Sequence, residues 1–166
     1  AHSGYVPGTL DVARFGLRWQ WALPEGRSYT LAPPAVAGAR VALAAQGIGG
    51  NADTELFVLD EADGSLRWRR PGDVGSQAYF SAPALSASRL FSSMVLQDAQ
   101  LGTVVMLRAF DLASGSPVFS TPVPTQWHAS LPPVLAGTRV LVDGGQGNGV
   151  ASIDAASGQL QWRAGA

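Results

Sequence analysis

Short apolar runs bounded by turn-forming residues recur along the chain. Residues 56–59 (Leu-Phe-Val-Leu) and 66–68 (Leu-Arg-Trp) flank one such turn and have the apolar and aromatic character that β-strands prefer. Within the turn, Asp60 can accept hydrogen bonds from backbone amides ahead of it, and Gly64 can adopt the positive φ that ends a tight turn. The pattern therefore predicts an antiparallel β-hairpin.

Two blocks of sequence each recur three times. The first places Pro and Arg six residues apart and occupies residues 32–41, 81–90 and 131–140. The second places Gly four residues and an aromatic residue eight residues after Asp, in residues 59–68, 110–119 and 153–162. The distance from Arg to the following Asp varies (20, 22 and 15 residues), so length changes are confined to one loop. Constant spacing within both blocks indicates a duplicated structural unit.

Each unit is interpreted as two hairpins, which together predict a four-stranded antiparallel sheet. In the first block, Pro34 suits a strand start, Ala37-Gly38-Ala39 suits a turn, and residues 41–43 begin the returning strand. The repeat length of 43 to 51 residues between successive Asp positions is that of a β-propeller blade. The residues that define the second block, and for which we expect structural roles, are Asp60, Gly64, Trp68, Asp111, Gly115, Phe119, Asp154, Gly158 and Trp162.

The resulting prediction is an all-β chain forming a single partial β-propeller. We expect three four-stranded blades at residues 24–70, 71–121 and 122–164. A degenerate copy of the second block, Leu10-Asp11 followed by Trp19, predicts a remnant strand pair at residues 9–23. Because a propeller takes typically four to eight blades, the chain is expected to be an open arc or part of a larger propeller.

One segment favours a different structure when it is considered alone. Leu90, Phe91, Met94 and Val95 have helical spacing within residues 84–101, which lack Gly and Pro. The alignment of this segment with the two other copies predicts strands, and we adopt the strand interpretation.

Composition narrows the classes of function. With 14% charged residues, 20 Gly and 11 Pro, the chain cannot be a coiled coil, and its 46% hydrophobic content is too high for a disordered chain. Its net charge is −1 and its Arg residues are dispersed, so no basic tract is available for nucleic acid or an anionic membrane. No apolar run approaches the length of a membrane span, and the absence of Cys removes disulfides and thiolate chemistry.

The pattern Pro-x-Val-x-Gly-x-Arg-Val followed by Leu-Asp-x-x-x-Gly-x-Leu-x-Trp resembles the repeats of the pyrroloquinoline-quinone-like (PQQ-like) β-propellers. That superfamily includes quinoprotein alcohol dehydrogenases and the propeller lipoprotein of the outer-membrane β-barrel assembly machine. The resemblance implies that Trp19, Trp68 and Trp162 dock between neighbouring blades, with Phe119 keeping the bulk but losing the indole donor. It also implies an extracytoplasmic protein, periplasmic or secreted.

An enzymatic function has little support from the residues. Quinoproteins of this fold use an Asp base, calcium and in many members a vicinal Cys pair, and this chain has no Cys. There is no Gly-x-Ser-x-Gly and no His-Glu-x-x-His. Residues 144–149 are rich in glycine but precede a strand, so a flexible turn is favoured over a phosphate site. Residues 49–55 lack the calcium-loop pattern and are interpreted as a solvated hairpin loop.

The candidate binding residues precede each Pro block, where the first strand of a blade enters the central channel. They combine polar and aromatic character at what the sequence suggests are equivalent places on three blades. They are Arg27, Tyr29, Gln77, Tyr79, Gln126, Trp127 and His128. Such residues suit a peptide or sugar-like ligand, and the alternative is that the aromatic side chains only plug the channel mouth. No catalytic residue and no metal ligand is assigned.

The sequence therefore predicts a non-catalytic scaffold that presents its channel-mouth face to a protein or peptide partner, with no resident cofactor. A fragment of a quinone-dependent oxidoreductase, which would take PQQ with calcium, and a carbohydrate-binding propeller remain alternatives. The exposed flanks of an open arc would be covered by further blades of a longer chain or by a homo-oligomer that closes the propeller.

Overall fold

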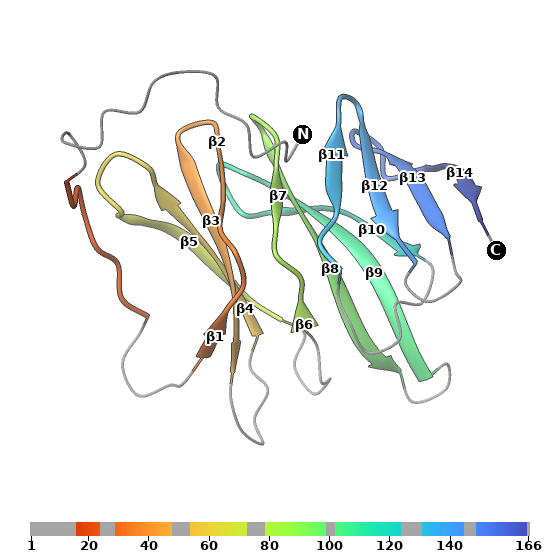
Figure 1. Ribbon diagram of the computed structural model, residues 1–166, viewed down its shortest axis with the longest axis horizontal. Coiled ribbons are helices and arrows are strands. Elements are labelled where there is room, and N and C mark those ends of the chain that lie inside the picture. The colour runs from red at the N-terminus through yellow and green to blue at the C-terminus, as the bar shows by residue number, and fades with distance from the viewer. Residues whose placement is uncertain are drawn as a thin grey trace.

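The computed structural model describes residues 16–23, 29–47, 54–72, 79–98, 102–123, 131–144 and 149–165. These residues form three antiparallel sheets that lie side by side along an arc (Figure 1). No helix occurs among them, so no helix in the described ranges could cross a membrane. The all-β, propeller-blade fold expected from the sequence is confirmed.

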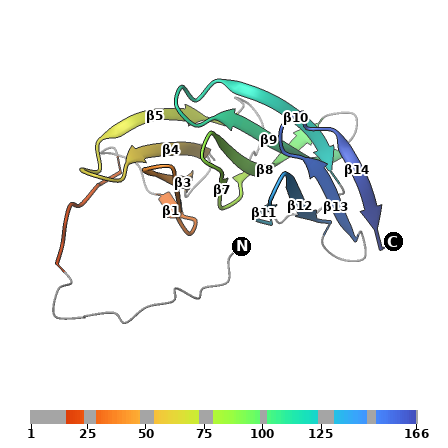
Figure 2. The same ribbon diagram turned by 90° about the horizontal axis from the view of Figure 1, so that it is seen from above.

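Each sheet is one blade of the arc. The strands of the first blade are β1 (Tyr29–Leu31), β2 (Ala35–Ala37), β3 (Arg40–Gly47), β4 (Thr54–Asp60) and β5 (Leu66–Pro71). Those of the second are β6 (Tyr79–Phe80), β7 (Ala84–Leu85), β8 (Arg89–Asp98), β9 (Gly102–Asp111) and β10 (Pro117–Val123). Those of the third are β11 (Val134–Ala136), β12 (Arg139–Asp143), β13 (Val150–Asp154) and β14 (Leu160–Ala164). Seen from above, β5, β10 and β14 lie on the convex side of the arc, and β1, β7 and β11 lie on the concave side (Figure 2).

The innermost strand is interrupted in the first and second blades. Both β1 and β2 pair with β3, and both β6 and β7 pair with β8, so two short strands share the place of one. The Ala32 amide still bonds the Ala44 carbonyl (2.9 Å), and Pro33 and Pro34 follow at once. Because proline has no N–H to donate, the ladder breaks there and resumes at Ala35.

Within the segment with helical spacing, residues 84–101, Ala84–Leu85 form β7 and Arg89–Asp98 form β8, with a turn at residues 86–88 between them. Leu90 and Met94 of β8 pack towards the first blade, while Phe91 and Val95 pack towards the third. A strand buried on both faces is apolar at odd and even positions alike, which can reproduce helical spacing. The strand interpretation is confirmed.

The apolar core lies between blades rather than within any one of them. One cluster joins Leu56 and Val58 of the first blade to Met94 and Phe110 of the second. A second cluster joins Leu107 and other residues of the second blade to Val140, Val142 and Ile153 of the third. Each blade is thus stabilised mainly by its neighbours.

The amino-terminal segment departs from the expectation. Residues 16–23, which we call the arm, form no strand, so they do not make the strand pair expected at residues 9–23, whose first part lies outside the described residues. An isolated pair of strands is at best marginally stable without a sheet to join, and the arm has no strand partner among the described residues. It packs on the first blade instead, with the ring centroids of Trp21 and Phe57 5.1 Å apart.

Candidate functional site

The aspartate of each second block organises the turn that follows it. Asp60 Oδ1 accepts the Ala62 amide (2.9 Å), Asp111 Oδ1 accepts the Ser114 amide (2.8 Å), and Asp154 Oδ1 accepts the Ser157 amide (2.8 Å). In all three turns the amide of the glycine four residues later bonds the carbonyl of the same aspartate. The repeated Asp-x3-Gly spacing therefore builds one turn geometry three times.

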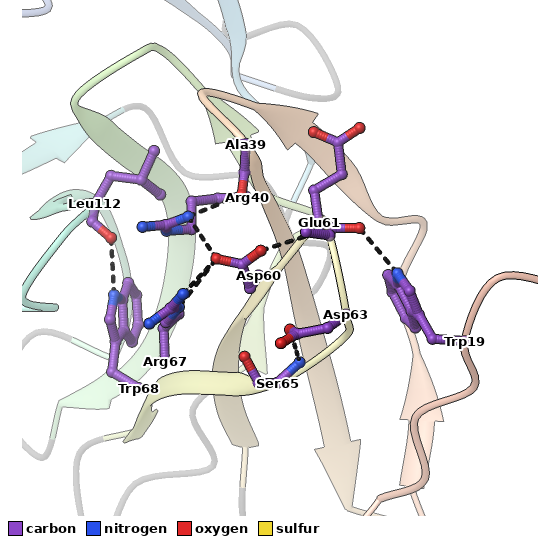
Figure 3. Close-up of polar contacts among 11 residues, drawn as sticks. Trp19, Ala39, Arg40, Asp60, Glu61, Asp63, Ser65, Arg67, Trp68 and Leu112 are labelled. Atoms are coloured by element: carbon purple, nitrogen blue, oxygen red, sulfur yellow. Dashed lines mark hydrogen bonds and ion pairs between the residues drawn. The ribbon is translucent and has the colours of Figure 1, made fainter.

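Hydrogen bonds to these carboxylates favour their charged form. The pKa of Asp60 is lowered by its hydrogen bond with Arg67, by the Ala62 amide and by the charge of Arg40. Arg67 Nε and Arg40 Nη1 approach Asp60 Oδ2 at 3.1 and 3.0 Å (Figure 3). The pKa of Asp111 is lowered chiefly by the Ser114 hydroxyl and amide, and that of Asp154 by the Ser157 amide and hydroxyl. These carboxylates are thus engaged in the turns.

An aromatic side chain from the preceding segment covers the glycine of each turn. A Cβ built on Gly64 would lie 2.6 Å from Trp19 Cε3, one on Gly115 would lie 2.8 Å from Trp68 Cδ2, and one on Gly158 would lie 2.5 Å from Phe119 Cγ. All three glycines are buried and have φ between +71° and +76°. Only glycine suits both the backbone conformation and the close approach of the ring.

In two of these turns, a backbone carbonyl three residues before the glycine accepts a hydrogen bond from the indole N–H of the covering tryptophan. Trp19 Nε1 donates to the Glu61 carbonyl (2.8 Å) and Trp68 Nε1 to the Leu112 carbonyl (2.9 Å), as Figure 3 shows. Each acceptor is the residue directly after the turn aspartate. We call the buried glycine together with this carbonyl a socket, so that the chain has sockets at Gly64, Gly115 and Gly158.

Side chains two residues beyond the aromatic residue reinforce two of the sockets. Arg70 Nε donates to the Gly115 carbonyl (2.8 Å) and Thr121 Oγ1 to the Gly158 carbonyl (2.6 Å). The Arg70 guanidinium also lies 5.6 Å from the Phe110 ring centroid. These contacts, which sequence reasoning missed, hold neighbouring blades in fixed relative positions.

The structure places Trp162 differently from the other aromatic residues of the repeat. It lies on β14 opposite Ser152 of β13, and 39% of its surface is exposed. No described residue accepts a hydrogen bond from its indole. Trp162 is therefore presented on the flank of the third blade, with no socket beneath it among the described residues.

Of the candidate binding residues, the structure describes Tyr29 and Tyr79. Arg27, Gln77, Gln126, Trp127 and His128 lie outside the described residues. Tyr29 begins β1 and Tyr79 begins β6, and both strands begin at the lower edge of the arc in Figure 1, opposite the aspartate turns. The two tyrosines are half-buried and belong to the same edge, which we call the mouth edge.

The two tyrosines are not at equivalent positions in their blades. Tyr29 pairs with Gly47, seven residues after Arg40, whereas Tyr79 pairs with Val95, six residues after Arg89. Because successive strand residues point to opposite faces, this offset of one places them on opposite faces of their blades. Tyr79 packs against the cluster between the second and third blades.

A buried threonine fixes the strand that carries Tyr79. Thr54 Oγ1 donates to the Ala45 carbonyl and accepts the Phe80 amide, each at 3.2 Å. The bond crosses from β4 of the first blade to β6 of the second. Thr54 was not singled out from the sequence, where a lone threonine at a strand start carries no signal of a contact 26 residues away.

The carboxylates of the repeat are used within their own turns. The repeat carboxylates of Asp60, Asp111 and Asp154 accept hydrogen bonds within their own turns. In the ranges that the structure describes, no three His, Cys, Asp or Glu residues come together as a metal site would need. Of the loop at residues 49–55, Thr54 and Glu55 are described and belong to β4, and Gly144 closes the other glycine-rich loop by donating to the Gly149 carbonyl (2.7 Å).

A family model described as outer membrane protein assembly factor BamB matches residues 10–165. The match covers nearly the whole chain, including all three blades and their sockets. The chain belongs to this family of PQQ-like β-propellers.

Two solved structures are similar to this BamB-like chain. A quinohemoprotein alcohol dehydrogenase from Pseudomonas putida HK5 aligns with a TM-score of 0.59 and 20% identity over 90% of the chain and 22% of the dehydrogenase. BamB from Moraxella catarrhalis aligns with a TM-score of 0.33 and 14% identity over 88% of the chain and 52% of that protein. A search of curated proteins found no match. The chain thus spans about a fifth of the dehydrogenase, a likeness that shows the propeller fold alone.

Proposed function

We propose that the chain is a non-catalytic propeller scaffold whose mouth edge binds a protein or peptide segment, in an extracytoplasmic compartment. Membership of a family described as an outer membrane protein assembly factor supports a role in protein association. It equally supports a location outside the cytoplasm.

The observation that carries the proposal is the way in which hydrogen bonding and packing hold Tyr79 in place. Its strand is hydrogen-bonded to the first blade through Thr54, and its ring packs against the core of the second interface. A half-buried tyrosine on a rigid strand offers apolar contact area and a hydroxyl at little cost in conformational entropy. Tyr29 supplies a second aromatic side chain at the same edge.

A peptide selection with the full chain tests this function. A displayed library of random peptides is panned on the wild-type chain, and the selected peptides are titrated against Tyr79→Ala, Trp127→Ala and Tyr79→Phe variants. Loss of an aromatic contact at a binding site costs at least about tenfold in affinity, so both alanine variants should bind tenfold or more weakly. Tyr79→Phe keeps the ring and is expected to retain most of the affinity.

Val118→Ala serves as the matched control, because Val118 is exposed on β10 at the convex side of the arc. It should leave the affinity unchanged. Peptides that bind the alanine variants as tightly as the wild type would contradict the proposal. Saturable binding on a glycan array that requires Tyr79 would favour the carbohydrate-binding alternative, and calcium-dependent uptake of PQQ with a redox-sensitive absorbance would favour the oxidoreductase alternative.

A further inference from the structure

The described residues contain the aromatic residue of the repeat four times but a socket only three times. Trp19, Trp68 and Phe119 occupy the sockets at Gly64, Gly115 and Gly158. The fourth aromatic residue, Trp162, is exposed and its indole N–H has no acceptor among the described residues. A socket for Trp162 must therefore come from outside these residues.

The socket at Gly64 is filled in a different way from the others. Trp68 and Phe119 belong to β5 and β10, which are hydrogen-bonded into their blades. Trp19 belongs to the arm, which has no strand pairing, yet its ring covers Gly64 and its indole bonds the Glu61 carbonyl. The socket at Gly64 thus binds an indole whose chain is not part of a sheet.

The segment around Trp162 matches the segments that fill two of the sockets. Leu17-Arg18-Trp19, Leu66-Arg67-Trp68 and Leu160-Gln161-Trp162 share the same spacing of leucine and tryptophan. Trp162 also faces the same way as Trp68, since it lies opposite Ser152 as Trp68 lies opposite Val58, two positions before the turn aspartate. Trp162 is consequently presented in the orientation that the other socket aromatic residues use.

Both flanks that would meet carry exposed apolar side chains. Val36, on β2 of the first blade, is 59% exposed, and Leu31 and Leu66 of the same blade are also exposed. On the third blade, Val134 and Val150 accompany Trp162 and are exposed as well. Contact between the two flanks would bury apolar surface as the two interblade clusters do.

We propose that the socket at Gly64 is an exchange site, in which Trp162 of a second copy of this chain replaces Trp19 and joins the copies head to tail. The proposal is independent of binding at the mouth edge. The new contact would continue the interblade interface that the chain already forms internally. Because the two surfaces differ, the contact is heterologous, and it closes into a ring or grows according to the rotation between copies.

The arm competes with the second copy for the socket. A segment joined by a short linker has an effective concentration of about millimolar, so wild-type chains should associate only at high concentration. Removing the Trp19 ring vacates the socket and should strengthen association, whereas removing the Trp162 ring should abolish it.

Light scattering on the full chain tests the exchange. Wild type, Trp19→Ala, Trp162→Ala and the double variant are measured over a range of concentrations, with circular dichroism to check that each is folded. Trp19→Ala should associate at concentrations at least tenfold lower than the wild type, while Trp162→Ala and the double variant stay monomeric. A monomeric, folded Trp19→Ala chain overturns the proposal, and so does a double variant that associates as Trp19→Ala does.

Cysteine cross-linking provides a test that leaves both tryptophans in place. The chain has no Cys, so single cysteines can be introduced without background. Ala62→Cys lies in the turn of the Gly64 socket, and Ala113→Cys is its matched control in the turn of the Gly115 socket. An Ala164→Cys chain mixed with each under mild oxidation should cross-link to the Ala62→Cys chain at least tenfold faster, because Ala164 occupies the position from which Arg70 and Thr121 reach the socket of the next blade. Equal rates, or no cross-link with either, would overturn the proposal.

Discussion

Arg89 donates through Nη1 to the carbonyl of Ala155, which is the acceptor position of the third socket. At the other two sockets the equivalent carbonyls, of Glu61 and Leu112, accept an indole N–H. The aromatic residue at the third socket is Phe119, which has no donor. An arginine from β8 thus supplies the hydrogen bond that the phenylalanine cannot make, and it reaches the Ala156 carbonyl as well.

Removal of this arginine should weaken the interface between the second and third blades. Arg89→Leu keeps an apolar stem but leaves the Ala155 carbonyl without its donor, so we expect a loss of about 1–3 kcal/mol in the free energy of unfolding, measured with urea. Adding Phe119→Trp in that background should restore about 1 kcal/mol, because the indole can take over the carbonyl. The same substitution in the wild type should gain nothing, and equal effects in both backgrounds would contradict the exchange of donors.

The glycine of a socket should be far less replaceable than a glycine in an open turn. Gly115 has φ +71°, and a Cβ there would lie 2.8 Å from Trp68 Cδ2. Gly115→Ala therefore combines left-handed strain with displacement of the ring, and we expect a cost of about 2–5 kcal/mol. Gly137 has φ +61° with nothing within 4 Å of a built Cβ, so Gly137→Ala isolates the strain and should cost about 1–2 kcal/mol.

Chemical denaturation of the two variants, followed by tryptophan fluorescence, measures this difference. The wavelength of emission should also shift in Gly115→Ala, because Trp68 is displaced from its socket. Equal losses in both variants would show that the rings adjust without cost.

The sequence predicted most where spacing alone decides the structure. The turn built on Asp60 and Gly64 needs only a carboxylate and a flexible residue at a set separation, so three copies sufficed to predict the hairpins. The interruption of the inner strand was less evident. Pro34 was expected at a strand start, which β2 confirms, but the short strand before it, β1, depends on pairing with β3 across the sheet.

The mouth edge was harder to predict because it depends on register. Tyr29 precedes Pro34 by five residues and Tyr79 precedes Pro83 by four, so the offset of one residue is present in the sequence, but the pairing with β3 and β8 is needed to see that it puts the two side chains on opposite faces. Similarly, the loss of a donor at Phe119 is visible in the sequence, whereas its replacement by Arg89 spans 66 residues and depends on how the blades meet. The docking of Trp68 on the next blade follows the repeat pattern, whereas the contact of Arg89 depends on packing between blades.

The turn carboxylates should give the protein an acid-sensitive stability. The folded-state pKa of Asp60 lies below its ordinary value of 3.8, so its contribution is present above that value and is lost as pH falls through the folded pKa. The difference in unfolding free energy between wild type and Asp60→Asn should therefore be constant near neutral pH and shrink as pH falls below 3.8. Urea unfolding between pH 7 and 2.5 measures it.

Added salt should distinguish stabilisation of these turns by ion pairs from stabilisation by hydrogen bonds. Asp60 is paired with Arg67 and Arg40, whereas Asp111 is held mainly by the Ser114 hydroxyl and amide. Because salt screens exposed charges, 0.5 M NaCl should reduce the effect of Asp60→Asn more than that of Asp111→Asn. Identical salt dependence in the two variants would argue against the arginine pairs as the source of the lowered pKa of Asp60.

Two adjacent buried serines of β8 should respond in opposite ways to replacement by alanine. Ser92 Oγ donates to the Ser81 carbonyl (3.0 Å), and Ser93 Oγ has no hydrogen-bond partner among the described residues. Ser92→Ala removes a buried hydrogen bond and should cost about 1–2 kcal/mol, while Ser93→Ala removes a desolvated hydroxyl and should be neutral or stabilising by up to about 1 kcal/mol. The Ser93 amide, which donates to Ser81 Oγ (2.9 Å), is unchanged in both variants. Equal losses of unfolding free energy in urea would mean that the Ser93 hydroxyl has a hydrogen-bond partner in solution. The sign of the Ser93→Ala effect therefore decides whether the interface between the second and third blades contains an unpaired polar atom.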